Sequence, residues 1–210
     1  MDFDLFLNSI PKIQNQSLLG ELSHQKLAPP ERKELMANFD ATNCRKAAVL
    51  MLFYPKKNIT HLALILRTTY NGVHSSQIAL PGGKVENFDA NYQQTALRET
   101  HEEIGIIPDK ISVIRSFSEI YIPPSNFMVY PFLGFASQEL QFVIDANEVA
   151  GIVECPVSVL LDEASVVSMN MATSYSEMVD VPCFKIDNHY VWGATAMMLS
   201  ELKDVLLDSF

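Results

Sequence analysis

Two neighbouring apolar runs constrain the fold of this chain more than any other feature of its sequence. The first run, "AAVLMLFY" (47–54), is continuously apolar and is short enough to form one buried strand. The residues "KKN" (56–58) suit a turn, and "HLALILR" (61–67) then has the pattern of the next strand. We therefore expect the chain to place two consecutive strands in its core.

Helical patterns stand between and after the strand patterns. Residues 92–104 have helical spacing, with Asp89 and Asn91 where an N-cap is wanted and Gly105 where a helix stops. The tail from Thr195 to Leu207 also has apolar residues at helical spacing. Further strands are expected at 78–80, 111–120, 127–136 and 148–156, and a hairpin at 182–192 with its turn at Asp187–Asn188.

This order of elements predicts an α/β (α+β) fold, with a mixed β-sheet sandwiched between helices. The 210 residues fit one domain, or one domain with extensions. We expect a single domain over 1–210, with an N-terminal helical arm (1–40, broken at Pro29–Pro30), a core (41–193) and a C-terminal helix (194–210).

Charge and cysteine content restrict the partners and the compartment. Acidic residues exceed basic ones by 25 to 15, and the net charge of −10 argues against a nucleic-acid partner. No apolar run approaches the roughly 18 residues of a membrane span, so no membrane partner is expected. Cys44, Cys155 and Cys183 are widely spaced, which gives no disulfide framework or zinc pattern. They suit the cytoplasm and are expected in the core.

Three acids are concentrated on the helix predicted at 92–104. Glu102 and Glu103 lie within about 60° on either side of Glu99, so one face packs on the sheet while the other presents a carboxylate cluster. Such like charges destabilise a helix by a few tenths of a kcal/mol per pair. A divalent cation removes that cost, and oxygen ligands at this density suit Mg²⁺ or Mn²⁺. Three acids alone also fit an ordinary solvated helix face.

The segment "LPGGKVENFDANYQQTALRETHEEIGI" (80–106) decides between these readings, because it resembles the Nudix box. That box has the form G, five residues, E, seven residues, then R-E-U-x-E-E-x-G-U, with U an aliphatic residue. From Gly83, five residues lead to Asp89 and eight more to Arg98, so Asp replaces Glu and one residue is added. Thr100 is polar where an aliphatic is usual. The matching positions are Arg98, Glu99, Glu102, Glu103, Gly105 and Ile106.

The preceding segment, "LRTTYNGVHSSQIALPGGK" (66–84), is similar to the signature of the coenzyme A pyrophosphatase branch of that family. Ser76 stands where Gly is usual, and Gly72 where a basic residue is frequent. Weaker similarities at 24–32, 121–132, 147–157 and 192–199 extend the resemblance over most of the chain. The fitting residues are Arg67, Thr68, His74, Gln77, Ile78, Pro81, Gly82 and Gly83.

The resemblance implies a Mg²⁺- or Mn²⁺-dependent hydrolase that cuts coenzyme A or an acyl-CoA into 3′,5′-ADP and 4′-phosphopantetheine. A small nucleotide is then the expected partner, and a homodimer is compatible with the sequence. Ser76 and Gly72 keep open another nucleoside diphosphate derivative, such as ADP-ribose, NADH or a nucleoside triphosphate. A non-catalytic nucleotide-binding regulator is a further alternative, against which the intact acids of the box argue.

The resemblance also assigns roles within the box. Glu99 and Glu103, one helical turn apart, are the firmest metal ligands, and Glu102 is a third ligand or acts through water. A backbone carbonyl at Gly83 is expected to add a metal ligand, and Arg98 to orient the glutamates by a bidentate pair. The general base is a box glutamate or a downstream acid, of which Glu148 is favoured over Glu154.

Residues outside the box are expected to contact the substrate. Arg67 is the best cation for a phosphate, with Arg32 and Arg45 as weaker alternatives. His74 and Gln77 stand in the loop before the box. Ser125 and Asn126, in "YIPPSNF", bind polar groups of the substrate or belong to a rigid loop. Trp192 is expected to pack as a core or capping residue, in preference to stacking on adenine.

Overall fold

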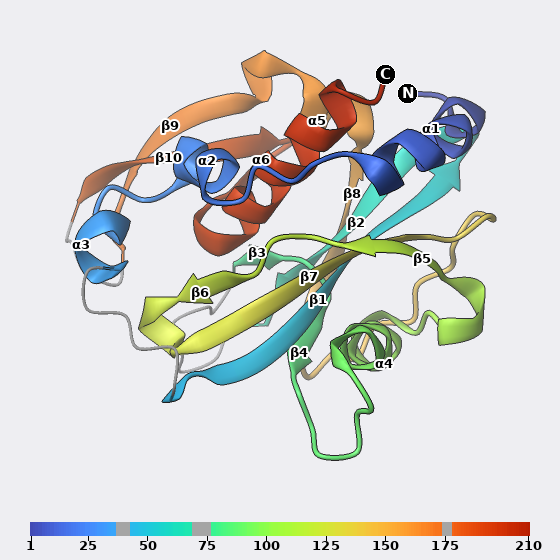
Figure 1. Cartoon of the computed structure of the whole chain (residues 1–210), viewed down its shortest axis with the longest axis horizontal. Coiled ribbons are helices and arrows are strands. Elements are labelled where there is room, and N and C mark those ends of the chain that lie inside the picture. Colours follow the sequence, from blue (N-terminus) through green and yellow to red (C-terminus); the bar gives the residue numbers. More distant parts are fainter. Residues whose placement is uncertain (37–42, 69–76, 174–177) are drawn as a thin grey trace.

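The computed structural model describes residues 1–36, 43–68, 77–173 and 178–210. Within these residues, eight strands form a central sheet in the order β3-β2-β1-β7-β5, with β4 and β6 extending β1 and β7 and with β8 beside β2 (Figure 1). β1 (Arg45–Lys56) is antiparallel to β2 (Ile59–Arg67) and parallel to β7 (Phe127–Phe135), so the sheet is mixed. Its other strands are β3 (Ile78–Ala79), β4 (Gly82–Lys84), β5 (Ser112–Ser116), β6 (Ile120–Ile122) and β8 (Val149–Pro156).

The two apolar runs form the β1–β2 hairpin at the centre of this sheet. Its turn places Lys57 and Asn58 at φ 51° and 62°, the left-handed pair that a tight hairpin requires. Side chains of β1 alternate between two cores, with Met51 and Phe53 on one face and Leu50 and Leu52 on the other. The run is continuously apolar because both of its faces are covered. The predicted pair of buried strands is confirmed.

Helices cover both faces of the sheet, which confirms the predicted fold class. α4 (Tyr92–Ile104) packs on one face, and α1 (Phe3–Asn15) and α6 (Gly193–Leu207) lie on the other (Figure 1). No helix of the described residues is long and apolar enough to span a bilayer. The shorter helices are α2 (Glu21–His24), α3 (Arg32–Met36) and α5 (Val157–Leu161), with 3₁₀ turns at Gln25–Leu27, Pro108–Lys110, Pro123–Ser125 and Glu163–Ser165.

A second, antiparallel sheet packs on the face that carries α6. It contains β9 (Val166–Met171), β10 (Val179–Ile186) and β11 (His189–Val191). The hairpin predicted at 182–192 is confirmed, with Asp187 in its turn at φ 50°. The single strand predicted over 111–120 is wrong, because β5 and β6 pair with β7 separately. The break lies opposite Pro131, which has no N–H to donate to a ladder.

The cysteines differ in burial, and this predicts which of them reacts. Cys155 and Cys183 are buried in the core as expected, whereas Cys44 is partly exposed, so the core prediction is wrong for Cys44. Burial raises the pKa of the Cys155 thiol to about 12 and also raises the pKa of Cys183. We expect iodoacetamide at pH 8 to alkylate only Cys44 in the native protein and all three cysteines after denaturation, as measured by peptide mass spectrometry. Rapid native labelling of Cys155 would contradict this assignment.

Candidate active site

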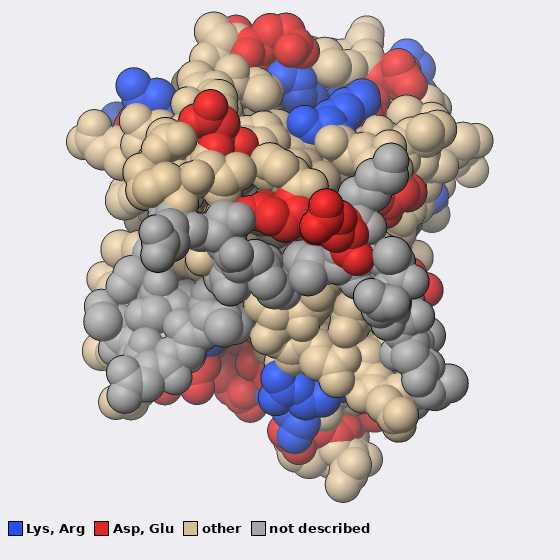
Figure 2. All heavy atoms as spheres, turned by 90° about the vertical axis from the view of Figure 1, so that its left-hand side faces the viewer, with Lys and Arg blue, Asp and Glu red and all other residues tan. Residues whose placement is uncertain are grey.

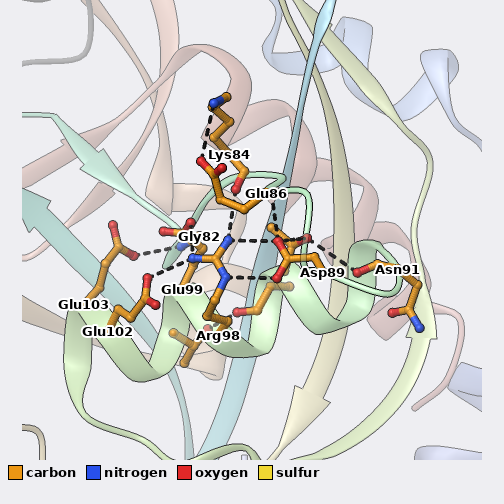
Figure 3. A network of polar contacts seen from close by, with 12 residues as sticks. Gly82, Lys84, Glu86, Asp89, Asn91, Arg98, Glu99, Glu102 and Glu103 are labelled. Atoms are coloured by element: carbon orange, nitrogen blue, oxygen red, sulfur yellow. Dashed lines mark hydrogen bonds and ion pairs between the residues drawn. The ribbon is translucent and has the colours of Figure 1, made fainter.

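Arg98 is the centre of a polar network that joins the β4–α4 loop to the acidic helix. Its Nε and Nη2 atoms donate to the two carboxylate oxygens of Asp89 at 3.0 and 2.9 Å. Its Nη1 atom donates to Glu99 and Glu102 at 2.7 and 2.8 Å, and Nη2 also reaches the Lys84 carbonyl at 3.0 Å. Figure 3 shows the carboxylates converging on this guanidinium from both sides. Arg98 thus holds Glu99 and Glu102 by one hydrogen bond each, and its bidentate partner is Asp89.

Asp89 does not cap the helix. The N-cap is Asn91, whose side chain accepts from the backbone N–H of Gln94 at 2.9 Å. Asp89 instead accepts from Arg98, from the hydroxyl of Thr95 at 2.8 Å and from the backbone of Glu86 at 2.9 Å. The hydrogen bonds from Arg98 hold the pKa of the Asp89 carboxyl well below its usual range. The loop before α4 is thus tied to the same guanidinium that orients the glutamates.

Glu103 is buried, so the expectation that all three carboxylates share an exposed face is wrong. Only 1% of Glu103 is exposed, because the β4 end of the sheet lies against this side of α4. Its carboxylate accepts from the backbone N–H of Gly82 at 2.8 Å and from Arg67 Nη1 at 3.3 Å. Burial nevertheless raises the pKa of Glu103 to about 8, against the lowering by these two donors. Burial thus disfavours the ionised form of this carboxyl in the metal-free chain, and a bound cation would favour it.

Glu99 lies directly against the backbone of Gly83. A Cβ atom at position 83 would collide with the Glu99 carboxylate, which would have to move aside. Burial raises the pKa of Glu99, and the hydrogen bond from Arg98 opposes this shift. Glu99 and Glu103 are therefore two largely buried carboxylates on successive turns that both face the β4 strand.

Replacing Gly83 by Ala tests this close approach. We expect hydrolysis to fall by about tenfold or more, because a displaced catalytic carboxylate loses its working geometry. Gly151 in β8 is the matched control, since a Cβ atom there meets nothing within 4 Å. Rates of the two variants should be compared at saturating metal, with melting temperatures as a measure of folding. Equal rates for Gly83→Ala and Gly151→Ala would show that the contact has no catalytic role.

The donor set of this helix fits a hard divalent cation. In the ranges 1–36, 43–68, 77–173 and 178–210, no three His, Cys, Asp or Glu side chains are grouped closely enough to hold one ion. In this conformation Arg98 holds Glu99 and Glu102, and the Gly82 N–H holds Glu103. The side chain of Glu102 is 57% exposed and can turn from Arg98 toward an ion. Carboxylate oxygens of this kind are the ligands that Mg²⁺ and Mn²⁺ prefer.

The two candidates for the general base lie in different surroundings. Glu148 is exposed and near the glutamates, since its charge contributes to raising the pKa of both Glu99 and Glu103. Glu154 accepts from Tyr54 and Lys56 at 2.5 and 2.8 Å. It pairs across the sheet with Ala63, four residues and about 13 Å along β2 from Arg67. The geometry therefore brings Glu148, and not Glu154, to the acidic helix.

A cavity of about 350 Å³ opens beside the glycine pair, on the sheet face opposite α4. Gly82, Gly83 and Arg67 belong both to its wall and to the surroundings of Glu99 and Glu103. Gln77 also lines it, whereas His74 lies outside the described residues. Most of its remaining wall is apolar and comes from Pro29, Val49, Leu80, Ile122, Phe127, Val129, Met197 and Met198.

The "YIPPSNF" residues have structural contacts of their own. Ser125 lines the cavity, but its carbonyl accepts from Arg45 at 2.5 Å. Asn126 adopts φ 52° and bonds to Tyr121 at 3.0 Å and to the Asn43 carbonyl at 3.2 Å. Asn126 is not among the residues that line the cavity. The structure thus brings Ser125 to the cavity and places Asn126 in the rigid loop.

Two cavity residues were given little weight in the sequence. Trp192 is half-buried at the N-cap of α6 and lines the cavity. Arg32, from α3, is a buried cation in the same wall. Both lie far from the box in sequence, and the weak similarities at 24–32 and 192–199 were the only signals for them.

The surface adds a further observation about charge. Figure 2 shows the Lys and Arg side chains of one face in small separate groups, with Asp and Glu side chains between them. On the described part of that face there is no continuous basic stripe of the kind that follows a nucleic-acid backbone.

Comparisons with known proteins show which family the chain belongs to. The NUDIX domain family matches residues 44–175. "Uncharacterized Nudix hydrolase NudL" of Citrobacter koseri is 30% identical over 197 residues, covering 90% of this chain and 96% of the relative. The protein of the same name from Enterobacter sp. (strain 638) is 30% identical over 168 residues, covering 78% and 83%.

Solved structures show the same fold at lower identity. The Nudix hydrolase RenU of M. smegmatis has a TM-score of 0.55 and 17% identity, over 78% of this chain and 86% of that one. A MutT/nudix family protein from Enterococcus faecalis has a TM-score of 0.56 and 15% identity, over 92% and 76%. Together with the matched domain and the 30% identical relatives, they lead to one assignment: the chain belongs to the Nudix hydrolase family and is a Nudix pyrophosphohydrolase.

Proposed function

We propose that this enzyme hydrolyses the pyrophosphate of coenzyme A or an acyl-CoA, giving 3′,5′-ADP and a 4′-phosphopantetheine species. One observation carries the proposal: two buried carboxylates, Glu99 and Glu103, adjoin a mostly apolar cavity through Gly82, Gly83 and Arg67. Such a cavity suits a long, largely uncharged group attached to a pyrophosphate. The similarity of residues 66–84 to the coenzyme A pyrophosphatase signature supports the same substrate.

Mg²⁺ or Mn²⁺ is the proposed cofactor, held by Glu99 and Glu103 with Glu102 and the Gly83 carbonyl. Such an ion lowers the pKa of bound water and neutralises phosphate oxygens. It also explains how a protein of net charge −10 binds a polyanion, because the metal supplies the positive field.

The residues of the chain divide the remaining tasks. Water attacks one phosphorus, the bond from that phosphorus to the bridging oxygen breaks, and the bridging oxygen leaves with the other phosphate. Glu148 accepts the proton of the attacking water, and Arg98 keeps the glutamates in position. Arg67, which bonds to Glu103 and lines the cavity, contacts a phosphate, and Gln77 lines the same cavity. The substrate role proposed for His74 rests on the sequence signature alone. Ser125 and Trp192 line the cavity that receives the uncharged part of the substrate. We also infer a cytoplasmic location, because the three cysteines are widely spaced and odd in number and give no disulfide framework.

Incubation with coenzyme A and Mn²⁺, followed by chromatographic separation of the products, tests the proposal. We expect equal amounts of 3′,5′-ADP and 4′-phosphopantetheine. ADP-ribose, NADH and a nucleoside triphosphate should be offered at the same concentration, and Glu103→Gln should serve as the inactive control. Rapid turnover of one of these three without cleavage of coenzyme A would remove the coenzyme A assignment and leave the family unaffected.

A further inference from the structure

Arg32 is a buried cation that the proposed chemistry does not use. It is 8% exposed, lines the cavity, and donates from Nη1 to the Tyr121 carbonyl at 2.8 Å. Burial is the largest influence on the guanidinium and lowers its pKa, against a smaller opposing effect of Glu21. The described residues provide no ion pair for it. A charge in such surroundings calls for a partner that the described part of the chain does not supply.

One edge of this guanidinium carries a donor that is not used within the described residues. The Nε atom of Arg32 is buried and has no hydrogen-bond partner among the described residues. Arg98 uses the corresponding edge of its guanidinium, formed by Nε and Nη2, to donate to both carboxylate oxygens of Asp89. The same edge of Arg32 is therefore suited to an oxyanion of a molecule in the cavity. Glu31 lines the cavity too, and its carboxylate accepts from the Thr173 hydroxyl at 3.1 Å.

The position of Arg32 separates it from the bond that is cut. Its partner Tyr121 pairs with Met128 of β7, and Gly83 pairs with Ala48 of β1. From β4 through β1 and β7 to β6 there are three strand spacings, or about 14 Å. A pyrophosphate held at Glu99 and Glu103 is too short to reach this far.

We propose that Arg32 binds a second anionic group of the substrate, a phosphate or carboxylate remote from the pyrophosphate. This inference rests on the proposed function and names a determinant of specificity within it. In coenzyme A the 3′-phosphate is such a group, and in an acyl-CoA a terminal carboxylate of the acyl chain is another.

Two pairs of substrates separate these sources. The ratio of kcat/KM is measured for coenzyme A over 3′-dephospho-CoA, and for succinyl-CoA over butyryl-CoA, with the wild-type enzyme and Arg32→Gln. In one pair, we expect the wild type to have the higher kcat/KM for the substrate with the extra anion. In Arg32→Gln, the kcat/KM ratio of that pair should fall by about tenfold or more. Its rate on the partner substrate without the anion should stay within about threefold of the wild type.

Each outcome has one meaning. A loss confined to the first pair places the 3′-phosphate at Arg32, and a loss confined to the second places the carboxylate there. Unchanged ratios, or an equal fall for both members of each pair, would overturn the inference while coenzyme A cleavage persists. Cleavage of none of the four by the wild type would remove the proposed function and the inference with it.

Two further variants exclude a folding defect. Arg115→Gln is the matched control, because Arg115 also donates to a backbone carbonyl, that of Ile13 at 2.9 Å, and does not line the cavity. Arg32→Lys keeps the charge and is expected to recover part of the preference. Melting temperatures of all variants accompany the kinetics. If Arg32→Gln melts below the assay temperature, only Arg32→Lys is compared with the wild type. An Arg32→Lys enzyme with the same kcat/KM ratios as the wild type would then overturn the role of the guanidinium edge.

Discussion

Glu103→Gln is expected to lower kcat for pyrophosphate hydrolysis by about a hundredfold or more without loss of the fold. Loss of one key electrostatic group in an active site has this scale. Glu103 is buried against Gly82 and Arg67. No water molecule can therefore take the place of its carboxylate when the charge is removed. Gln has the same shape and still accepts from the Gly82 N–H, so packing is kept while the charge is removed.

Glu86→Gln is the control for this loss. Glu86 lies in the β4–α4 loop, but its carboxylate pairs with Lys84 at 3.3 Å and its side chain is 42% exposed. The rate of hydrolysis by Glu86→Gln should equal that of the wild type. A Glu103→Gln enzyme with full activity at saturating Mn²⁺ would show that the metal site is elsewhere.

The sequence predicted those parts of the molecule that depend on local contacts. The β1–β2 hairpin follows from two apolar runs around a turn, and α4 follows from its spacing and from Gly105, which ends the helix at φ 75°. Asn91 is an N-cap because its short side chain reaches the backbone of its own helix. These features involve neighbours in sequence, so their residue types are sufficient to identify them.

The parts that the sequence did not predict depend on contacts between distant segments. Asp89 and Asn91 are equivalent as cap candidates until the position of Arg98 is known, and only the fold shows that Asp89 is its partner. A helical projection placed Glu103 on the open face, because it contains no information about β4. The cavity is assembled from segments between Pro29 and Met198, most of which carry ordinary core residues.

The buried carboxylate also has a consequence for stability when metal is withheld. In the presence of a chelator, the free energy of unfolding of the wild type should decrease as pH rises from about 4.5 to about 8. The Glu103 carboxyl has a pKa of about 8 in the folded chain, raised from 4.5 by burial. Between these values the unfolded chain is ionised while the folded chain keeps its proton, so each rise in pH favours unfolding. The stabilisation is complete below the lower value and is lost as pH passes the upper one.

Glu103→Gln separates this effect from the other titrating groups. The variant cannot ionise at position 103, so it should retain a few kcal/mol more of its low-pH stability at pH 8.5 than the wild type, as measured by urea denaturation with chelator present. A smaller decrease remains, because burial also raises the pKa of Glu99. If the free energy of unfolding decreased equally with pH in the two proteins, the buried carboxyl of Glu103 would not be the cause of the decrease. Adding Mn²⁺ at pH 8.5 should stabilise the wild type more than Glu103→Gln, since an ion that binds only the folded state stabilises it more the tighter it binds, and the wild type has the stronger site. A substitution that lessens the loss of stability of the metal-free protein at high pH, and also lowers kcat about a hundredfold, would identify the burial of Glu103 as a feature that serves the cation and not the fold.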